Sequence, residues 1–69
     1  NIIYYMIPKE GMLIANEMDG EYWYYIVVKD HSRKSGFSQY GLTGTDSGIY
    51  WRCEQINKDD IILHDPEEE

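Results

Sequence analysis

The stretch from Asp19 to Lys29 constrains the fold more than any other part of the chain. It starts with Asp19-Gly20 and continues through Glu21 into seven consecutive apolar or aromatic residues, the first four of them aromatic. Asp-Gly ahead of such a run favours a two-residue hairpin, because glycine tolerates positive φ and aspartate tolerates it better than most residues. The stretch therefore predicts a hairpin turn followed by a strand over Glu21–Lys29.

Both faces of this predicted strand are apolar. Successive side chains of a strand point to opposite faces. One face receives Trp23, Tyr25 and Val27, and the other receives Tyr22, Tyr24, Ile26 and Val28. A strand that is apolar on both sides lies in the centre of a two-layered structure or is half covered by a partner. We therefore expect a central strand whose first set of side chains forms core and whose second set, above all Tyr22 and Tyr24, faces outward.

Apolar runs on either side of this strand predict an all-β chain of five to six short strands. The further strands are predicted at residues 2–7, 12–17, 37–43, 49–56 and 61–63. A Gly-rich turn is predicted at residues 44–48, and residues 57–60 fit a single 3₁₀ turn before the last strand. The predicted interior consists of Trp23, Tyr25, Val27, Phe37, Ile49 and Trp51.

This order of strands and turns resembles an SH3-like barrel. The similarity covers about residues 11–63, from the first Gly-containing turn through the Asp-Gly hairpin and the aromatic strand to the short closing strand. Tudor-type and related small barrels are similar in the same way. The resemblance implies a small barrel and assigns no functional residue. The run at residues 2–7 is an addition to that plan, and it could close the barrel or pair with the same strand of a second copy.

The length of the chain limits its stability. Its 69 residues make one domain, predicted over residues 1–63 and followed by an acidic, disordered tail over residues 64–69. A domain of this size usually needs a disulfide, a metal, an oligomer or very tight packing. Cys53 is the only cysteine, so an internal disulfide is ruled out, and one cysteine with two histidines falls short of a structural zinc set. Tight packing or a homo-oligomer therefore has to stabilise the domain. Its ten aromatic residues can provide the large buried area that either needs.

The charge of the chain indicates the class of partner. The formal net charge is −7. Without Asp65, Glu67, Glu68 and Glu69, nine of the thirteen acids remain against six bases, which leaves −3. An acidic surface repels a phosphate backbone, so we expect no direct nucleic-acid binding and a protein partner with a basic surface instead. No run approaches the roughly 20 apolar residues of a membrane-spanning helix, and a lone thiol without a targeting signal indicates a cytoplasmic setting.

The sequence offers little support for an enzyme, and we predict no catalytic residue, no cofactor and no metal site. It has no Gly-rich phosphate loop, no nucleophile elbow and no spacing typical of metal ligands. Alternation places Cys53 on the inward side of its strand, which is typical of a buried structural cysteine. His31 lies in a polar loop and His64 at the edge of the acidic tail, where both are expected to be solvated.

The excess of aromatic residues predicts a protein-binding surface. A barrel this small cannot bury them all, and exposed tyrosines are enriched at interfaces because they bury area at low entropic cost. The predicted partner-binding residues are Tyr22, Tyr24, Tyr40 and Tyr50 as anchors, with Glu17, Asp19, Glu21 and Asp46 as complementary charge. We expect a small inhibitor of a larger, nucleic-acid-processing or defence enzyme, of phage or mobile-element type. Ordinary cross-strand packing of the tyrosines is the competing explanation.

Two other binding functions stay open. A homo-oligomer could hold a small anionic ligand such as a nucleotide, with Arg33, Lys34 and Arg52 meeting its charge and tyrosines stacking on its base. A Tudor-like aromatic cage could instead read a methylated lysine or arginine by cation–π attraction. That cage would be built from Tyr22, Tyr40, Tyr50 and Asp46.

Overall fold

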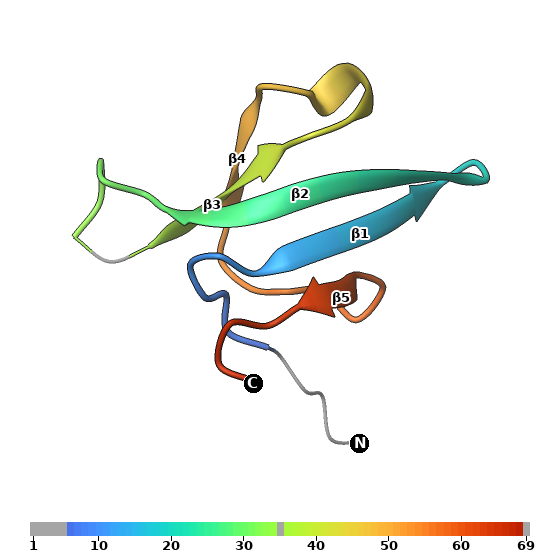
Figure 1. Cartoon of the computed structure of the whole chain (residues 1–69). Coiled ribbons are helices and arrows are strands. Elements are labelled where there is room, and N and C mark those ends of the chain that lie inside the picture. Colours follow the sequence, from blue (N-terminus) through green and yellow to red (C-terminus); the bar gives the residue numbers. More distant parts are fainter. Residues whose placement is uncertain (1–5, 35, 69) are drawn as a thin grey trace.

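The computed structural model describes residues 6–34 and 36–68, which form one five-stranded antiparallel sheet (Figure 1). Its strands are β1 (Leu13–Met18), β2 (Glu21–Lys29), β3 (Phe37–Gly41), β4 (Tyr50–Cys53) and β5 (Ile61–His64). Their order in the sheet is β4-β3-β2-β1-β5, so four consecutive strands are neighbours and β5 returns to pair with β1. The prediction of a small, barrel-like all-β fold is confirmed, although the described sheet keeps β4 and β5 as edges and is not closed.

The hairpin between β1 and β2 has the predicted two-residue turn. Asp19 and Gly20 have φ angles of 50° and 83°, and Met18 pairs with Glu21 on either side of them. Two central residues with positive φ are typical of a type I′ turn, whose twist matches that of the flanking strands. β2 has the predicted bounds and lies in the middle of the five strands, which explains why both of its faces are apolar.

The 3₁₀ helix η1 (Gly44–Asp46) lies between β3 and β4, and not at residues 57–60 as predicted. Gly44 has a φ of 68°, and the ring of Trp23 packs so closely on it that a Cβ would lie 2.9 Å from the nearest ring atom. At residues 57–60 the backbone N–H of Asp60 donates to the carbonyl of Asn57 (3.0 Å). The N–H of Asn57 in turn donates to the Asp60 carboxylate (3.1 Å). These two hydrogen bonds close a single turn, which takes the place of the predicted 3₁₀ turn.

The core lies on one face of the sheet, which we call the core face. It is formed by Met12, Ile14, Val27, Cys53 and Ile56, with Phe37 and Ile62 packed against them and Tyr25 buried beside them. Ile56 reaches it from the segment after β4, which crosses beneath the sheet toward β5 (Figure 1). The N–H of Ile56 donates to the carbonyl of Met6 (2.9 Å), so the first described residues and the β4–β5 connection meet at the core.

Two residues predicted as core are exposed. Trp51 shares the core face and pairs with Gln39, but its side chain is 46% exposed because β4 is an edge strand. Ile49 precedes β4 in a turn and is also exposed. Trp23 and Phe37 are half-buried, whereas Tyr25 and Val27 are buried as predicted. The alternation predicted the correct side for Trp51, and the absence of strand closure leaves that side uncovered.

The two ends of the described chain lie together. Lys9 Nζ is 2.9 Å from Asp65 Oδ2, and Asp65 is buried. β5 includes His64, so the boundary predicted at residue 63 falls within this strand. The ion pair with Lys9 holds Asp65, the residue after β5, against the sheet domain. Of the strand predicted at residues 2–7, residues 2–5 lie outside the described residues. Met6 forms a single antiparallel bridge with Ile56.

Candidate protein-binding face

The side of the sheet opposite the core carries exposed aromatic and aliphatic side chains, and we call it the open face. Paired residues of an antiparallel sheet point to the same side, so the register identifies its members. They are Leu13, Ala15, Glu17, Tyr22, Tyr24, Ile26, Val28, Ser38, Tyr40, Tyr50, Arg52, Ile61 and His64. Only Glu17 and Arg52 among them are charged, and they lie at opposite ends of the face, so its centre is uncharged.

The apolar residues of the open face are contiguous. Tyr24, Ala15 and Ile61 form one row across β2, β1 and β5. The next row runs across four strands through Leu13, Ile26, Tyr40 and Tyr50. Scattered apolar residues are normal on a surface, but a continuous exposed patch marks an interaction site. On the open face Tyr22, Tyr24, Tyr50 and Ile61 are exposed, whereas the residues between them are half-buried or, at Ala15, buried. The exposed side chains therefore stand on a continuous apolar surface.

The four predicted anchor tyrosines all lie on the open face. Tyr22 is 50% exposed and Tyr50 is 65% exposed. Tyr40 and Tyr50 form a cross-strand pair with ring centroids 4.7 Å apart and a tilt of 52°. Ordinary packing of tyrosines across strands therefore accounts for Tyr40, which is half-buried, but it leaves most of Tyr50 in solvent.

The structure separates the four predicted acids into two groups. Glu17 pairs with Tyr22 on the open face, Asp19 forms the adjoining turn, and Glu21 follows it. These three acids share the β1–β2 hairpin, and all are exposed. Asp46 lies in η1, and its Oδ2 accepts a 2.7 Å hydrogen bond from the hydroxyl of Tyr25. Asp46 thus approaches the sheet from the core face.

The residues of the aromatic cage are not brought to one point. Tyr40 pairs with Ile26, and Tyr22 lies four residues away from Ile26 along the same strand. At a rise of about 3.3 Å per residue, Tyr22 lies roughly 13 Å from the Tyr40–Tyr50 pair. Asp46, the acid of the cage, contacts the opposite side of the sheet through Tyr25.

Two of the three cations expected to meet an anionic ligand are paired with carboxylates of the chain. Arg33 Nε is 2.8 Å from Asp30 Oδ2, and Arg33 Nη1 is 2.8 Å from Glu54 Oε1. Arg52 pairs with the same oxygen of Glu54. The bonds from Arg33 and Arg52 lower the pKa of Glu54. A ligand would have to compete with these internal acids.

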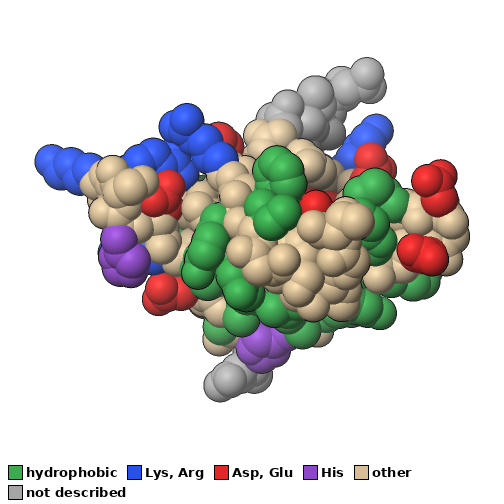
Figure 2. All heavy atoms as spheres, turned by 90° about the horizontal axis from the view of Figure 1, so that it is seen from above, with side chains coloured by type: hydrophobic (Ala, Val, Ile, Leu, Met, Phe, Trp, Pro, Cys, Tyr) green, Lys and Arg blue, Asp and Glu red, His purple; other side chains and the backbone are tan. Residues whose placement is uncertain are grey.

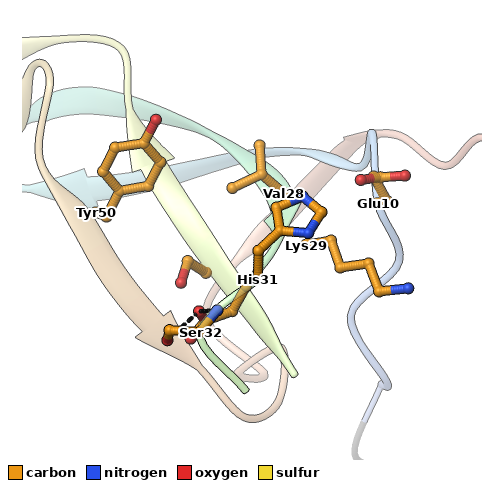
Figure 3. A pocket seen from close by; sticks show the side chains of 8 residues that line it. Glu10, Val28, Lys29, His31, Ser32 and Tyr50 are labelled. Carbon is orange, nitrogen blue, oxygen red and sulfur yellow. Dashed lines mark hydrogen bonds between the residues drawn. The ribbon is translucent and has the colours of Figure 1, made fainter. Parts of the chain in front are cut away.

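A hollow of about 610 Å³ lies where the open face meets the β2–β3 loop (Figure 3). It is lined by Glu10, Val28, Lys29, Asp30, His31, Ser32, Ser38 and Tyr50. In Figure 3 the imidazole of His31 lies between Tyr50 on one side and Glu10 on the other. The Asp30 carboxylate accepts bonds from the N–H (2.9 Å) and hydroxyl (2.6 Å) of Ser32, which fix the loop wall. The sequence did not predict this hollow, because Glu10 and Tyr50 are distant along the chain.

Cys53 has the properties of a structural cysteine. Its side chain is buried, and desolvation, followed by the nearby Asp60 and Glu54 carboxylates, raises the pKa of the thiol. Because the thiolate is the nucleophilic form, a raised pKa makes the sulfur less reactive. Within residues 6–34 and 36–68, no group of three His, Cys, Asp or Glu side chains is placed to hold a metal ion.

No protein-family profile matches this chain, and comparisons with curated proteins and with solved structures gave no match either. The described part of the chain has no helix with the length and apolar character needed to cross a bilayer.

Proposed function

We propose that this chain is a protein-binding module and that the open face of the sheet is its binding surface. The observation that carries the proposal is the continuous apolar patch with Tyr22, Tyr24 and Tyr50 exposed on it. The centres of protein interfaces are depleted of charge and enriched in aromatic residues, and the open face has the same composition. A tyrosine that is already held in a strand also loses little entropy on binding.

The chemistry of the partner follows from what borders the patch. Glu17, Asp19 and Glu21 lie at the hairpin end, next to Tyr22. A partner with an apolar surface and an adjacent basic patch would complement both features. Inhibition of a larger nucleic-acid-processing or defence enzyme by a protein of phage type is the specific role that we favour, in a cytoplasmic setting. The free, buried thiol of Cys53 is compatible with a reducing compartment.

The two alternative functions receive less support. The anionic-ligand function needs cations that the chain itself neutralises, at Arg33 and Arg52. The cage function needs Tyr22 beside Tyr40 and Tyr50, which β2 holds roughly 13 Å apart. Neither is favoured by a specific contact among the described residues.

The test compares Tyr50 with its neighbour Trp51. Both are exposed on β4, but Tyr50 lies on the open face and Trp51 on the core face. We expect Tyr50→Ala and Tyr24→Ala to keep the circular dichroism spectrum of the wild type and to lose capture of a partner from lysate of the source cell. Trp51→Ala should retain that capture. A photo-crosslinker placed at position 50 should label the partner, and one at position 51 should not.

Two results would contradict the proposal. If Tyr24→Ala and Tyr50→Ala both unfold the chain, these tyrosines stabilise the fold and the open face loses its anchors. If both variants fold and capture the partner as the wild type does, binding occurs elsewhere on the molecule.

A further inference from the structure

We propose that two copies of this chain pair through the free edge of β4, as antiparallel strands related by a two-fold axis at Trp51. The two five-stranded sheets then form one continuous sheet. The inference goes beyond the proposed function and does not depend on it, because it concerns the edge of the sheet and not the open face. It is carried by the free backbone groups of β4 and by the exposed side chains around them.

β4 presents backbone groups that no neighbouring strand engages. It is an end strand of the sheet and pairs with β3. The carbonyl of Ile49 accepts a bond from the N–H of the last residue of β3 (2.8 Å), so this carbonyl points toward β3. Bonding alternates along an antiparallel strand. Trp51 therefore also bonds to β3, whereas the N–H and carbonyl groups of Tyr50 and Arg52 point to the free edge. Within the described part of the chain, no other backbone group bonds to them.

The opposite edge, β5, has features that protect an edge strand, and β4 lacks them. The register of β5 against β1 shifts between Leu13 and Ile14, and Pro66 follows shortly after the strand. A bulge and a proline both discourage pairing with a further strand. β4 keeps an unbroken register with β3 and contains no proline or lysine. Its one charged residue, Arg52, is paired with Glu54. These differences place the contact at β4.

The free backbone groups select one symmetric register. In this register Tyr50 of each copy lies opposite Arg52 of the other, and the two Trp51 residues face each other at the axis. All the free donors and acceptors of Tyr50 and Arg52 are then used. A shift of two residues one way places Arg52 opposite Arg52, and like charges directly opposite are destabilising. The same shift the other way places Arg52 opposite Gly48, whose N–H is already bonded to Gly41 and whose φ of 83° is not that of a strand.

This register also covers the apolar side chains that β4 leaves exposed. Trp51 is 46% exposed, and Ile49, two residues before it, is 41% exposed. The two-fold axis is perpendicular to the sheet, so the core faces of both copies lie on the same side. The two Trp51 rings therefore pack on each other, with an Ile49 at either end of the pair. On the open face, the Tyr50 ring lies beside the Arg52 guanidinium of the second copy, where cation–π attraction favours the contact.

The edges meet without a contact between like charges. Arg52 keeps its bond to Glu54, and this register places Glu54 opposite Gly48 of the second copy. Figure 2 looks onto the side of the molecule that carries β4 and η1, and it shows hydrophobic side chains between charged side chains that lie mostly at the two ends. The net charge of −7 on each copy adds general repulsion, which is screened beyond about 8 Å at physiological salt. A second copy therefore matches this edge in backbone groups, charge and apolar area.

The contact is small, so the dimer is weak. A fully covered aromatic residue buries roughly 150–250 Å², so the partly exposed Trp51 and Tyr50 offer on the order of 200 Å² per copy. Even with the paired backbone, the total stays below the roughly 1,200 Å² under which complexes are weak and transient. We expect a dissociation constant on the order of 100 µM. At the low micromolar concentrations of an unfolding experiment the chain is monomeric.

The test is sedimentation equilibrium of the purified chain from about 20 µM to about 2 mM. We expect the wild type to dimerise over this range. Arg52→Pro removes an outward N–H, and proline is tolerated on an edge strand where the missing N–H faces solvent. The matched control Arg52→Ala loses the same side chain but keeps the N–H. Because the lost bond occurs twice in a symmetric dimer, Arg52→Pro should have a dissociation constant at least about tenfold higher than Arg52→Ala.

A photo-crosslinker at position 51 checks the register. In a mixture of isotopically labelled and unlabelled chains it should link two copies, and mass spectrometry should locate the link within residues 49–53 of the second copy. The product contains only this chain, so it is distinct from a captured partner. The same crosslinker at position 22, exposed on the far hairpin, should link no copies.

Three results would overturn the inference: a wild type that is monomeric at about 2 mM, equal dissociation constants for Arg52→Pro and Arg52→Ala, or crosslinks from position 51 that fall outside residues 49–53. Circular dichroism shows whether Arg52→Pro is folded, and if it is not, the position of the crosslink decides. Capture of a partner by the open face is measured separately, so failure of the dimer leaves the proposed function standing.

Discussion

The hydroxyl of Tyr25 donates a 2.7 Å hydrogen bond to the carboxylate of Asp46 and so ties the central strand β2 to η1, the turn that leads into β4. Tyr25 is only 6% exposed. Desolvation and then the bond to Asp46 raise the pKa of Tyr25 to about 12. The sequence predicted Asp46 as charge for a partner, whereas one of its oxygens is engaged within the fold.

Tyr25→Phe should lower the free energy of unfolding at neutral pH by about 1 kcal/mol, because Asp46 loses its donor. The folded state holds the Tyr25 proton up to about pH 12 and the unfolded state releases it near pH 10. The stability that the protonated Tyr25 hydroxyl contributes is therefore complete below about pH 10, and it is lost as the pH rises through about 12. Urea unfolding across this range should show a smaller alkaline loss in Tyr25→Phe than in the wild type or in the exposed control Tyr22→Phe. Equal losses in all three proteins would argue against the raised pKa.

Gly41→Ala should be among the most destabilising small substitutions in the chain. A Cβ at Gly41 would overlap the backbone carbonyl of Asp46, and neither group can move freely. The N–H of Gly41 donates to Ile49 (2.8 Å), and its carbonyl accepts from Gly48 (2.9 Å). We expect a loss of about 3 kcal/mol, measured by chemical denaturation. Gly20→Ala, which has free space but a φ of 83°, should lose only about 1–2 kcal/mol. A larger loss of stability in Gly20→Ala than in Gly41→Ala would show that the backbone at Asp46 can move away from Gly41.

Ile14→Ala and Trp51→Ala should differ strongly in stability. Ile14 is fully buried on the core face, so its truncation should cost about 2–5 kcal/mol, much of the stability expected for a chain of this size. Trp51 lies exposed on the edge strand, and its truncation should cost about 1 kcal/mol or less. Equilibrium unfolding of the two variants checks this difference. A large loss in Trp51→Ala would mean that some part of the chain covers β4.

Cys53 should react slowly with a thiol reagent in the native protein. Its burial and the raised pKa of its thiol both reduce attack by the thiolate. We expect alkylation at neutral pH to be at least about 100-fold slower than in denaturant, since it requires opening of the core. Rapid labelling without denaturant would make Cys53 a candidate nucleophile and would reopen the question of an enzymatic function.

The sequence determined the features that depend on local backbone conformation and on the two-residue period of a strand. Asp19-Gly20 supplied the positive φ angles of the hairpin, and the apolar run after it predicted the bounds of β2 and its central place. The same alternation correctly separated Tyr25 and Val27 from Tyr22 and Tyr24. These conclusions needed only neighbouring residues.

Only the tertiary structure decided which faces are covered. The side of Trp51 was predictable, but its exposure depends on β4 remaining an edge and on the path of the β4–β5 connection through Ile56. The engagement of Asp46 by Tyr25 and the meeting of Glu10 with Tyr50 at one hollow join residues that are far apart in the chain. Periodicity gives the side of a strand on which a residue lies, whereas burial depends on long-range packing, which local sequence does not encode.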